Sequence, residues 1–195
     1  YLKALGATVY VCPASVPADD PRSYYEVAKR IAKETPNSVY INQYFNELNI
    51  DAHYQTTGPE IWKQTEGKIS HLFACTGTGG TLSGSAKYLK EQNPDIKIIG
   101  VDADGSILKT YHETGKINKT EIHPYQIEGL GKNLIPGALL FDRIDEFVRV
   151  NDEMSAYRTR EIALKEAIMG GYTTGAVTQA LIQYANSHEF KKDDL

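Results

Sequence analysis

The chain has 195 residues, of which 41% are hydrophobic, and a formal net charge of −4 at pH 7. This composition is typical of a globular protein with a sizeable core, in one large or two small domains. Acidic and basic residues are interspersed, so no electrostatic pattern predicts binding to nucleic acid or to an anionic membrane. A small soluble molecule is the expected partner.

No apolar run approaches the roughly 18 residues of a membrane span, and Tyr1 opens the chain without a signal-peptide core. The two cysteines, Cys12 and Cys75, and the five histidines lack the spacings typical of zinc sites. We therefore expect a cytoplasmic protein with reduced thiols and no metal. Residues 1–6 resemble the end of a helix stopped by Gly6, and residues 191–195 the approach to a strand, so a piece of a longer protein is expected.

Short runs rich in β-branched residues alternate with segments of helical spacing. The predicted strands cover residues 8–12, 38–41, 69–74, 96–101 and 144–150. Strand and helix in repetition predict an α/β fold, with a parallel twisted sheet and helices on both faces. Such sheets bind ligands at the carboxyl ends of their strands.

Two of the predicted helices follow directly from apolar spacing. The first carries Leu82, Ala86 and Leu89, and the second carries Met154, Tyr157, Leu164 and Ile168. Asn151 or Asp152 is expected to cap the second helix at its N-terminus. Pro13, Pro17 and Pro21 predict a loop after the first strand, and residues 115–121 predict a second polar loop.

Residues 77–81 read GTGGT and stand between a predicted strand and a predicted helix. Glycines there let backbone N–H groups approach a ligand at the positive end of the helix dipole, which predicts a site for a phosphate monoester. The loop lacks the GxxxxGK[ST] pattern, and Leu82 replaces the third glycine of GxGxxG, so neither a nucleoside triphosphate nor a dinucleotide is indicated. The alternative is a tightly packed turn without a ligand.

Three other stretches repeat this design. Residues 170–176 place Thr173 and Thr174 after two glycines at the start of a helix, residues 128–131 form another glycine loop, and residues 43–46 put amides after a short strand. Each alone is typical of a turn. Four such stretches in one α/β chain favour a ligand cleft.

Residues 43–62, 77–81, 128–137 and 171–176 resemble, in order and spacing, the cysteine synthase and cystathionine β-synthase group. These are pyridoxal-phosphate enzymes of fold type II, and the likeness extends over nearly the whole chain. Residues 34–38 and 101–108 are more similar to cystathionine β-synthases. Residues 56–62 and 135–137 are more similar to cysteine synthases, so the reaction subtype stays open, with cystathionine β-synthase slightly favoured.

The resemblance implies roles for ten residues. Those expected to bind pyridoxal 5'-phosphate are Gly77, Thr78, Gly79, Gly80 and Thr81 at its phosphate and Thr173 at its pyridine nitrogen, and those expected to border the substrate are Gln43, Gly129, Leu130 and Gly131. A threonine hydroxyl does not hold the ring nitrogen protonated as an aspartate does, which favours loss of a β-substituent. The implied reaction replaces the β-group of serine or an O-acylated serine with a thiol or sulfide, making cystathionine or cysteine.

The resemblance also divides the chain into the trailing part of a small N-terminal domain, residues 1–44, and a large cofactor-binding domain, residues 45–195, incomplete at its C-terminus. It places the Schiff-base lysine before Tyr1, and no lysine here, Lys132 included, has its sequence context. The chain alone is therefore expected to be inactive, and the full-length protein to be a homodimer. The alternative is a non-catalytic protein that binds a phosphate ligand or a partner.

Overall fold

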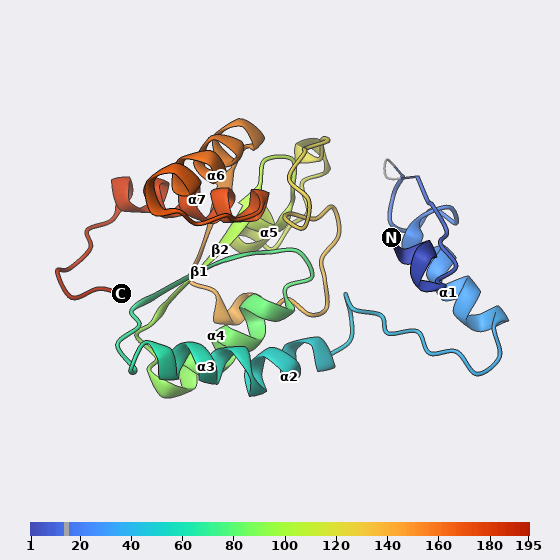
Figure 1. Ribbon diagram of the computed structural model, residues 1–195, viewed down its shortest axis with the longest axis horizontal. Helices are drawn as coiled ribbons and strands as arrows, with labels where there is room; N and C mark the ends of the chain where they lie inside the picture. The colour runs from blue at the N-terminus through green and yellow to red at the C-terminus, as the bar shows by residue number, and fades with distance from the viewer. Residues whose placement is uncertain (14–15) are drawn as a thin grey trace. The chain divides into compact units, whose positions relative to one another are not determined.

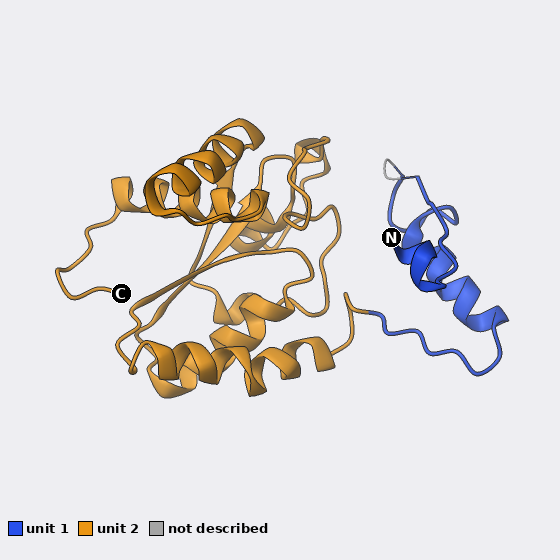
Figure 2. Cartoon of the chain, viewed as in Figure 1, with its two compact units in different colours: residues 1–42 blue, residues 43–195 orange. Residues whose placement is uncertain are grey.

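A computed structural model describes residues 1–13 and 16–195. The chain divides into two compact units, Tyr1–Asn42 and Gln43–Leu195 (Figure 2). We call them unit 1 and unit 2. The assignment of these units to a small and a large domain stays a prediction.

Unit 1 contains a 3-10 helix over Leu2–Leu5 and the helix α1, Tyr24–Glu34. Gly6 ends the first with a φ of 86°, as its sequence position predicted. The hydroxyl of Ser23 caps α1 by accepting a hydrogen bond from the backbone N–H of Glu26 at 3.2 Å. The proline-rich segment after residue 12 forms turns and irregular chain where it is described.

The predicted strands at residues 8–12 and 38–41 are wrong, because both segments are irregular in the structure. A strand is stable only beside a hydrogen-bonded neighbour and over a buried face. No strand forms in the part of unit 1 that the structure describes. Val11 and Val39 are 92% and 80% exposed, so their β-branched side chains have no core to cover.

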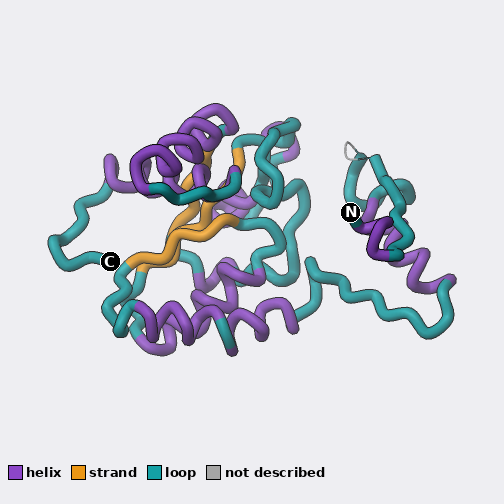
Figure 3. The backbone as a smooth tube through the Cα atoms, in the orientation of Figure 1, coloured by secondary structure: helices purple, strands orange, loops and turns teal. Residues whose placement is uncertain are grey.

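Unit 2 is built on a parallel sheet of three strands, in the order β1, β2, β3 (Figures 1 and 3). The strands are β1, His71–Cys75, β2, Lys97–Ala103, and β3, Glu146–Val150. His71 pairs with Lys97, and Ile99 with Glu146. The last three predicted strands and their parallel arrangement are thereby confirmed, with shifts at their ends.

Helices cover both faces of this sheet, as predicted (Figure 1). On one face lie α2, Leu48–Gln55, α3, Thr57–Gln64, and α4, Gly80–Gln92; on the other lie α6, Asp152–Glu166, and α7, Tyr172–Ser187. A short helix, α5, spans Leu108–Thr114, and 3-10 turns span Lys119–Glu121 and Phe141–Arg143. Neighbouring residues of β2 divide the core: Ile98 joins a cluster with Leu82 and Leu89 of α4, whereas Ile99 joins one with Ala176 of α7.

Helix α6 begins where the sequence predicted, with Asn151 accepting a hydrogen bond from the N–H of Met154 at 2.9 Å. Of the apolar residues predicted to line one face of it, Met154 is half-buried, Tyr157 and Leu164 are exposed, Leu164 to 87%, and Ile168 lies beyond its end at Glu166. The helix meets α7 through small residues instead, since a Cβ on Gly175 would overlap the carbonyl oxygen of Ser155. Close backbone contact therefore joins α6 to α7, in place of the packed apolar face that the residue spacing predicted.

We expect Leu89→Ala to lower the free energy of unfolding by about 2 to 5 kcal/mol, because it opens a cavity under a fully buried side chain. Leu164→Ala is the matched control, and its exposed side chain predicts a change within about 0.5 kcal/mol. Urea denaturation of both variants measures the difference. Equal losses would contradict this account of the core.

Candidate functional site

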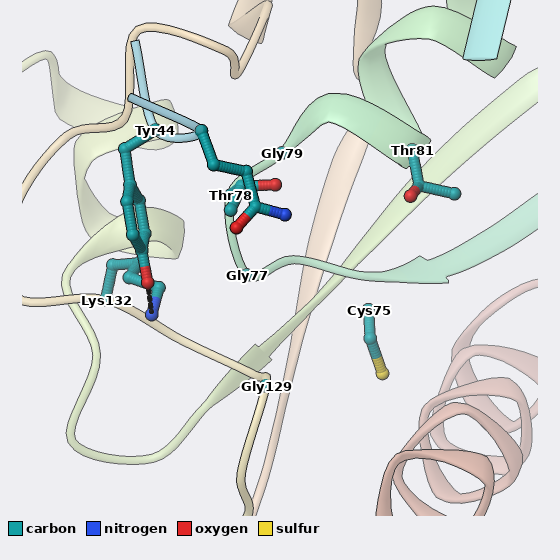
Figure 4. A pocket seen from close by; sticks show the side chains of 9 residues that line it. Tyr44, Cys75, Gly77, Thr78, Gly79, Thr81, Gly129 and Lys132 are labelled. Atoms are coloured by element: carbon teal, nitrogen blue, oxygen red, sulfur yellow. Dashed lines mark hydrogen bonds between the residues drawn. The ribbon is translucent and has the colours of Figure 1, made fainter. Parts of the chain in front are cut away.

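A cavity of about 350 Å³ opens at the carboxyl end of β1 (Figure 4). Its lining comes from four stretches of unit 2: Gln43 and Tyr44; Cys75, Gly77 to Gly79 and Thr81; Gly129; and Lys132. The predicted Gly80 is not among the lining residues. The strand β1 ends at Cys75 and helix α4 begins at Gly80, so the GTGGT turn delivers the first turn of α4 to this space. The location agrees with the predicted cleft at the edge of a parallel sheet.

The backbone N–H groups of the turn are available to a ligand. Over residues 1–13 and 16–195, no protein acceptor is hydrogen-bonded to the amides of Gly77, Thr78, Gly79, Thr81 or Leu82. The amide of Gly80 makes only a long contact of 3.5 Å with the hydroxyl of Thr78. Unpaired donors at the positive end of a helix dipole form an anion site.

Glycine is required where this turn meets the loop at residues 128–131. A Cβ on Gly77 would lie 2.6 Å from the carbonyl oxygen of Gly129. Gly79 has a φ of 92°, and a Cβ there would lie 2.6 Å from the Cβ of Leu139. The amide of Gly131 donates to the carbonyl of Thr76 at 2.9 Å. Two of the predicted glycine loops are therefore in backbone contact.

Helix α2 fixes the hydroxyl groups of the turn. The side-chain amide of Asn49 donates to the Oγ1 of Thr78 at 3.1 Å and to the carbonyl of Gln43 at 2.9 Å. The Nε2 of His53 lies 3.0 Å from the Oγ1 of Thr81. Asn49 and His53 were not among the predicted site residues, although their spacing of four residues places them on one helix face.

The N-terminus of α7 lies behind the cavity. Thr173 is the second residue of this helix, and its carbonyl accepts a hydrogen bond from the Sγ of Cys75 at 3.5 Å. Cys75 lines the cavity, whereas Thr173 is not among the lining residues. The second predicted helix N-terminus is thus at the same edge of the sheet, separated from the cavity by one side chain.

The remaining sequence-predicted residues divide between lining and support. Gln43 and Gly129 line the cavity. Leu130 is 1% exposed and packs in the core, and Gly131 is crowded by the side chains of Ala103 and Ser106, so these two shape the loop from behind. The structure adds Tyr44, Cys75 and Lys132 to the lining, none of which was predicted.

The lining is rich in hydrogen-bond donors and carries no acidic side chain from the described part of the chain. Burial raises the pKa of the Cys75 thiol to about 12, so this group is neutral at physiological pH. The ammonium of Lys132 lies 3.2 Å from the hydroxyl of Tyr44. A cavity of this polarity favours an anionic ligand.

A family model described as pyridoxal-phosphate dependent enzyme matches residues 1–195. The chain therefore belongs to this family of α/β enzymes that depend on pyridoxal phosphate.

Among individual relatives, it is 38% identical over 200 residues to a cystathionine β-synthase of Saccharomyces cerevisiae, covering 100% of this chain and 39% of that protein. It is 40% identical over 184 residues to a cystathionine β-synthase of Apis mellifera, covering 94% of this chain and 36% of that protein. It is 33% identical over 190 residues to a cysteine synthase 3 of Caenorhabditis elegans, covering 97% of this chain and 53% of that protein. The chain thus spans about half or less of the length of these relatives.

Among the helices of residues 1–13 and 16–195, none combines the length and apolar character needed to cross a bilayer. Within the same residues, no group of three or more His, Cys, Asp or Glu side chains is arranged to hold a metal ion.

Because only the thiolate is a strong nucleophile, we expect Cys75 to resist iodoacetamide through pH 9. The raised pKa places its ionisation near pH 12, and reactivity should increase only as the pH approaches that value. Peptide mass spectrometry of labelled protein, with urea-unfolded protein as the control, measures the reaction at Cys75. Half-maximal labelling near pH 8.5 would contradict the assignment.

Proposed function

We propose that the cavity holds pyridoxal 5'-phosphate, with its phosphate on the turn formed by residues 77–81. The observation that carries this proposal is the row of unpaired backbone amides facing a cavity in a member of a pyridoxal-phosphate family. The crowding at Gly77 and Gly79, where a side chain would overlap Gly129 and Leu139, supports a backbone turn that is held in this conformation. The hydroxyls of Thr78 and Thr81, held by α2, are the further donors proposed for the phosphate.

When bound, this cofactor supplies an electron sink that stabilises negative charge on the α-carbon of an amino acid. Thr173 is the proposed partner of its pyridine nitrogen, which is supported by the contact between Cys75 and the first turn of α7. Gln43 is the proposed ligand of the substrate carboxylate, because this residue lines the cavity. Gly129 borders the same space, with Leu130 and Gly131 supporting its loop.

The proposed reaction is β-replacement on serine or an O-acylated serine by a thiol or sulfide, making cystathionine or cysteine. Relatives named cystathionine β-synthase are up to 40% identical, which favours this activity over that of a cysteine synthase, at 33%. A relative from Bacillus subtilis, 33% identical, is named O-acetylserine dependent cystathionine β-synthase. Its name supports an O-acylated serine as a second proposed substrate beside serine. A non-catalytic phosphate-binding protein is the alternative.

We also propose that these 195 residues alone are inactive. Of the lysines that the structure describes, only Lys132 lines the cavity, and its ammonium is bonded to the hydroxyl of Tyr44. After borohydride reduction with pyridoxal phosphate, we expect no pyridoxyl group on any cavity residue, as read by peptide mass spectrometry. A stoichiometric adduct at Lys132 would overturn this part of the proposal. The full-length protein serves as the positive control.

For the full-length protein, we propose a homodimer in the cytoplasm. The exposed apolar side chains of Leu164, in the last turn of α6, and of Ile168 and Met169, in the segment that follows this helix, support a protein contact there. Cys12 and Cys75 are both free thiols, which suits a reducing compartment.

We expect Gly77→Ala in the full-length protein to weaken binding of pyridoxal phosphate by about tenfold or more, because the added methyl group displaces the carbonyl of Gly129 and the amides beside it. Fluorescence titration measures the affinity. Pyridoxal, which lacks the phosphate, is the matched ligand and should bind the variant nearly as well as it binds the natural protein. Equal affinities of the natural protein for the two ligands would contradict the proposed phosphate site.

The full-length protein should release cystathionine from serine and homocysteine faster than cysteine from acetylserine and sulfide. Chromatographic detection of both products measures the ratio. The reverse ratio would assign the cysteine synthase activity. Phosphate-dependent cofactor binding without either product would support the non-catalytic alternative.

A further inference from the structure

Lys132 gives the cavity a positive charge that was not predicted from the sequence. Within residues 1–13 and 16–195, it is the one charged side chain in the lining, and its ammonium forms no ion pair. Its contacts are with Tyr44, at 3.2 Å from the hydroxyl and 5.0 Å from the ring centroid. An ammonium has three donors, so two remain for a ligand.

The backbone of Lys132 is held in a fixed position. Its N–H donates to the hydroxyl of Ser106 at 2.8 Å, and its carbonyl accepts from the same hydroxyl at 3.0 Å and from the N–H of Ile107 at 3.0 Å. Ser106 is fully buried. Gly131, the residue that precedes Lys132, has a φ of 71° and packs against Ala103. This lysine therefore enters the cavity from a rigid base, unlike an ordinary surface lysine.

The ammonium of Lys132 lies in a different part of the cavity from the backbone amides proposed to bind the cofactor phosphate. In Figure 4, Lys132 and Tyr44 lie together on one side of Gly77, and Thr81 and Cys75 lie on the other. A ligand that fills both regions needs an anion at each. The ammonium of Lys132 and the hydroxyl of Tyr44 present adjacent polar groups, an arrangement suited to the two oxygens of a carboxylate.

We propose that Lys132, together with Tyr44, binds the carboxylate of the thiol acceptor, so that the site favours a carboxylate-bearing thiol over sulfide. This rests on the proposed function, in which Gln43 serves the carboxylate of the amino acid that loses its β-group. Lys132 then serves the second substrate. It is a specificity residue, because sulfide has no group for it to bind.

The equilibrium test compares two unreactive ligands in calorimetric titrations of the full-length protein with pyridoxal phosphate. The probes are 3-(methylthio)propionate and its neutral counterpart 3-(methylthio)propanol. We expect Lys132→Met to weaken binding of the carboxylate about tenfold and to leave binding of the alcohol unchanged, since a charge-assisted hydrogen bond is lost. Lys132→Arg should retain most of the affinity for the carboxylate. Lys63→Met, which removes an exposed lysine of α3, is the matched control and should match the natural protein.

The kinetic test uses mercaptoacetate and sulfide as acceptors. Lys132→Met should raise the KM for mercaptoacetate about tenfold and leave the KM for sulfide and the kcat for both near their natural values. A fall in the affinity for pyridoxal phosphate, or equal changes for the charged and neutral probes, would overturn the proposal. If the natural protein turned over neither acceptor and also made no cystathionine from serine and homocysteine, the proposed function would fail, and the titrations would still decide whether Lys132 binds a carboxylate.

Discussion

The site depends on one constraint, which is that the backbone donors at the start of α4 have no acceptor from the protein. Five N–H groups left in this state beside a cavity need solvent or an anion to satisfy them. Glycines at positions 77 and 79 create the geometry, because only they allow the turn to lie against Gly129 and Leu139. Asn49 and His53 then hold the threonine hydroxyls beside the same donors.

The polarity of the cavity follows from this constraint. The neutral thiol of Cys75 adds no negative charge, and the ammonium of Lys132 adds a positive one. The two positive regions stand apart, which separates the proposed place of the cofactor phosphate from that of a substrate carboxylate. The proposed reaction joins two amino acids and therefore needs a site for more than one anion, which this division would provide.

The sequence predicted the elements of unit 2 well where local signals and burial agree. The runs before Gly77, around Ile98 and around Phe147 are strands because helices cover both their faces. The same reasoning failed at residues 8–12 and 38–41, where β-branched residues have no neighbouring strand. It also misplaced the buried face of α6, because contact through Gly175 is invisible to a pattern of apolar residues.

By itself, the sequence determined the glycine turns, the caps and the alternation of strand and helix, since each depends on residues a few positions apart. It also carried the family likeness. Only the tertiary structure decided which side chains share the cavity: Tyr44 and Lys132 are 88 positions apart, and Asn49 and Thr78 are 29 apart. Such pairs form because the sheet brings the ends of separate strands and loops to one edge, and no local pattern records that meeting.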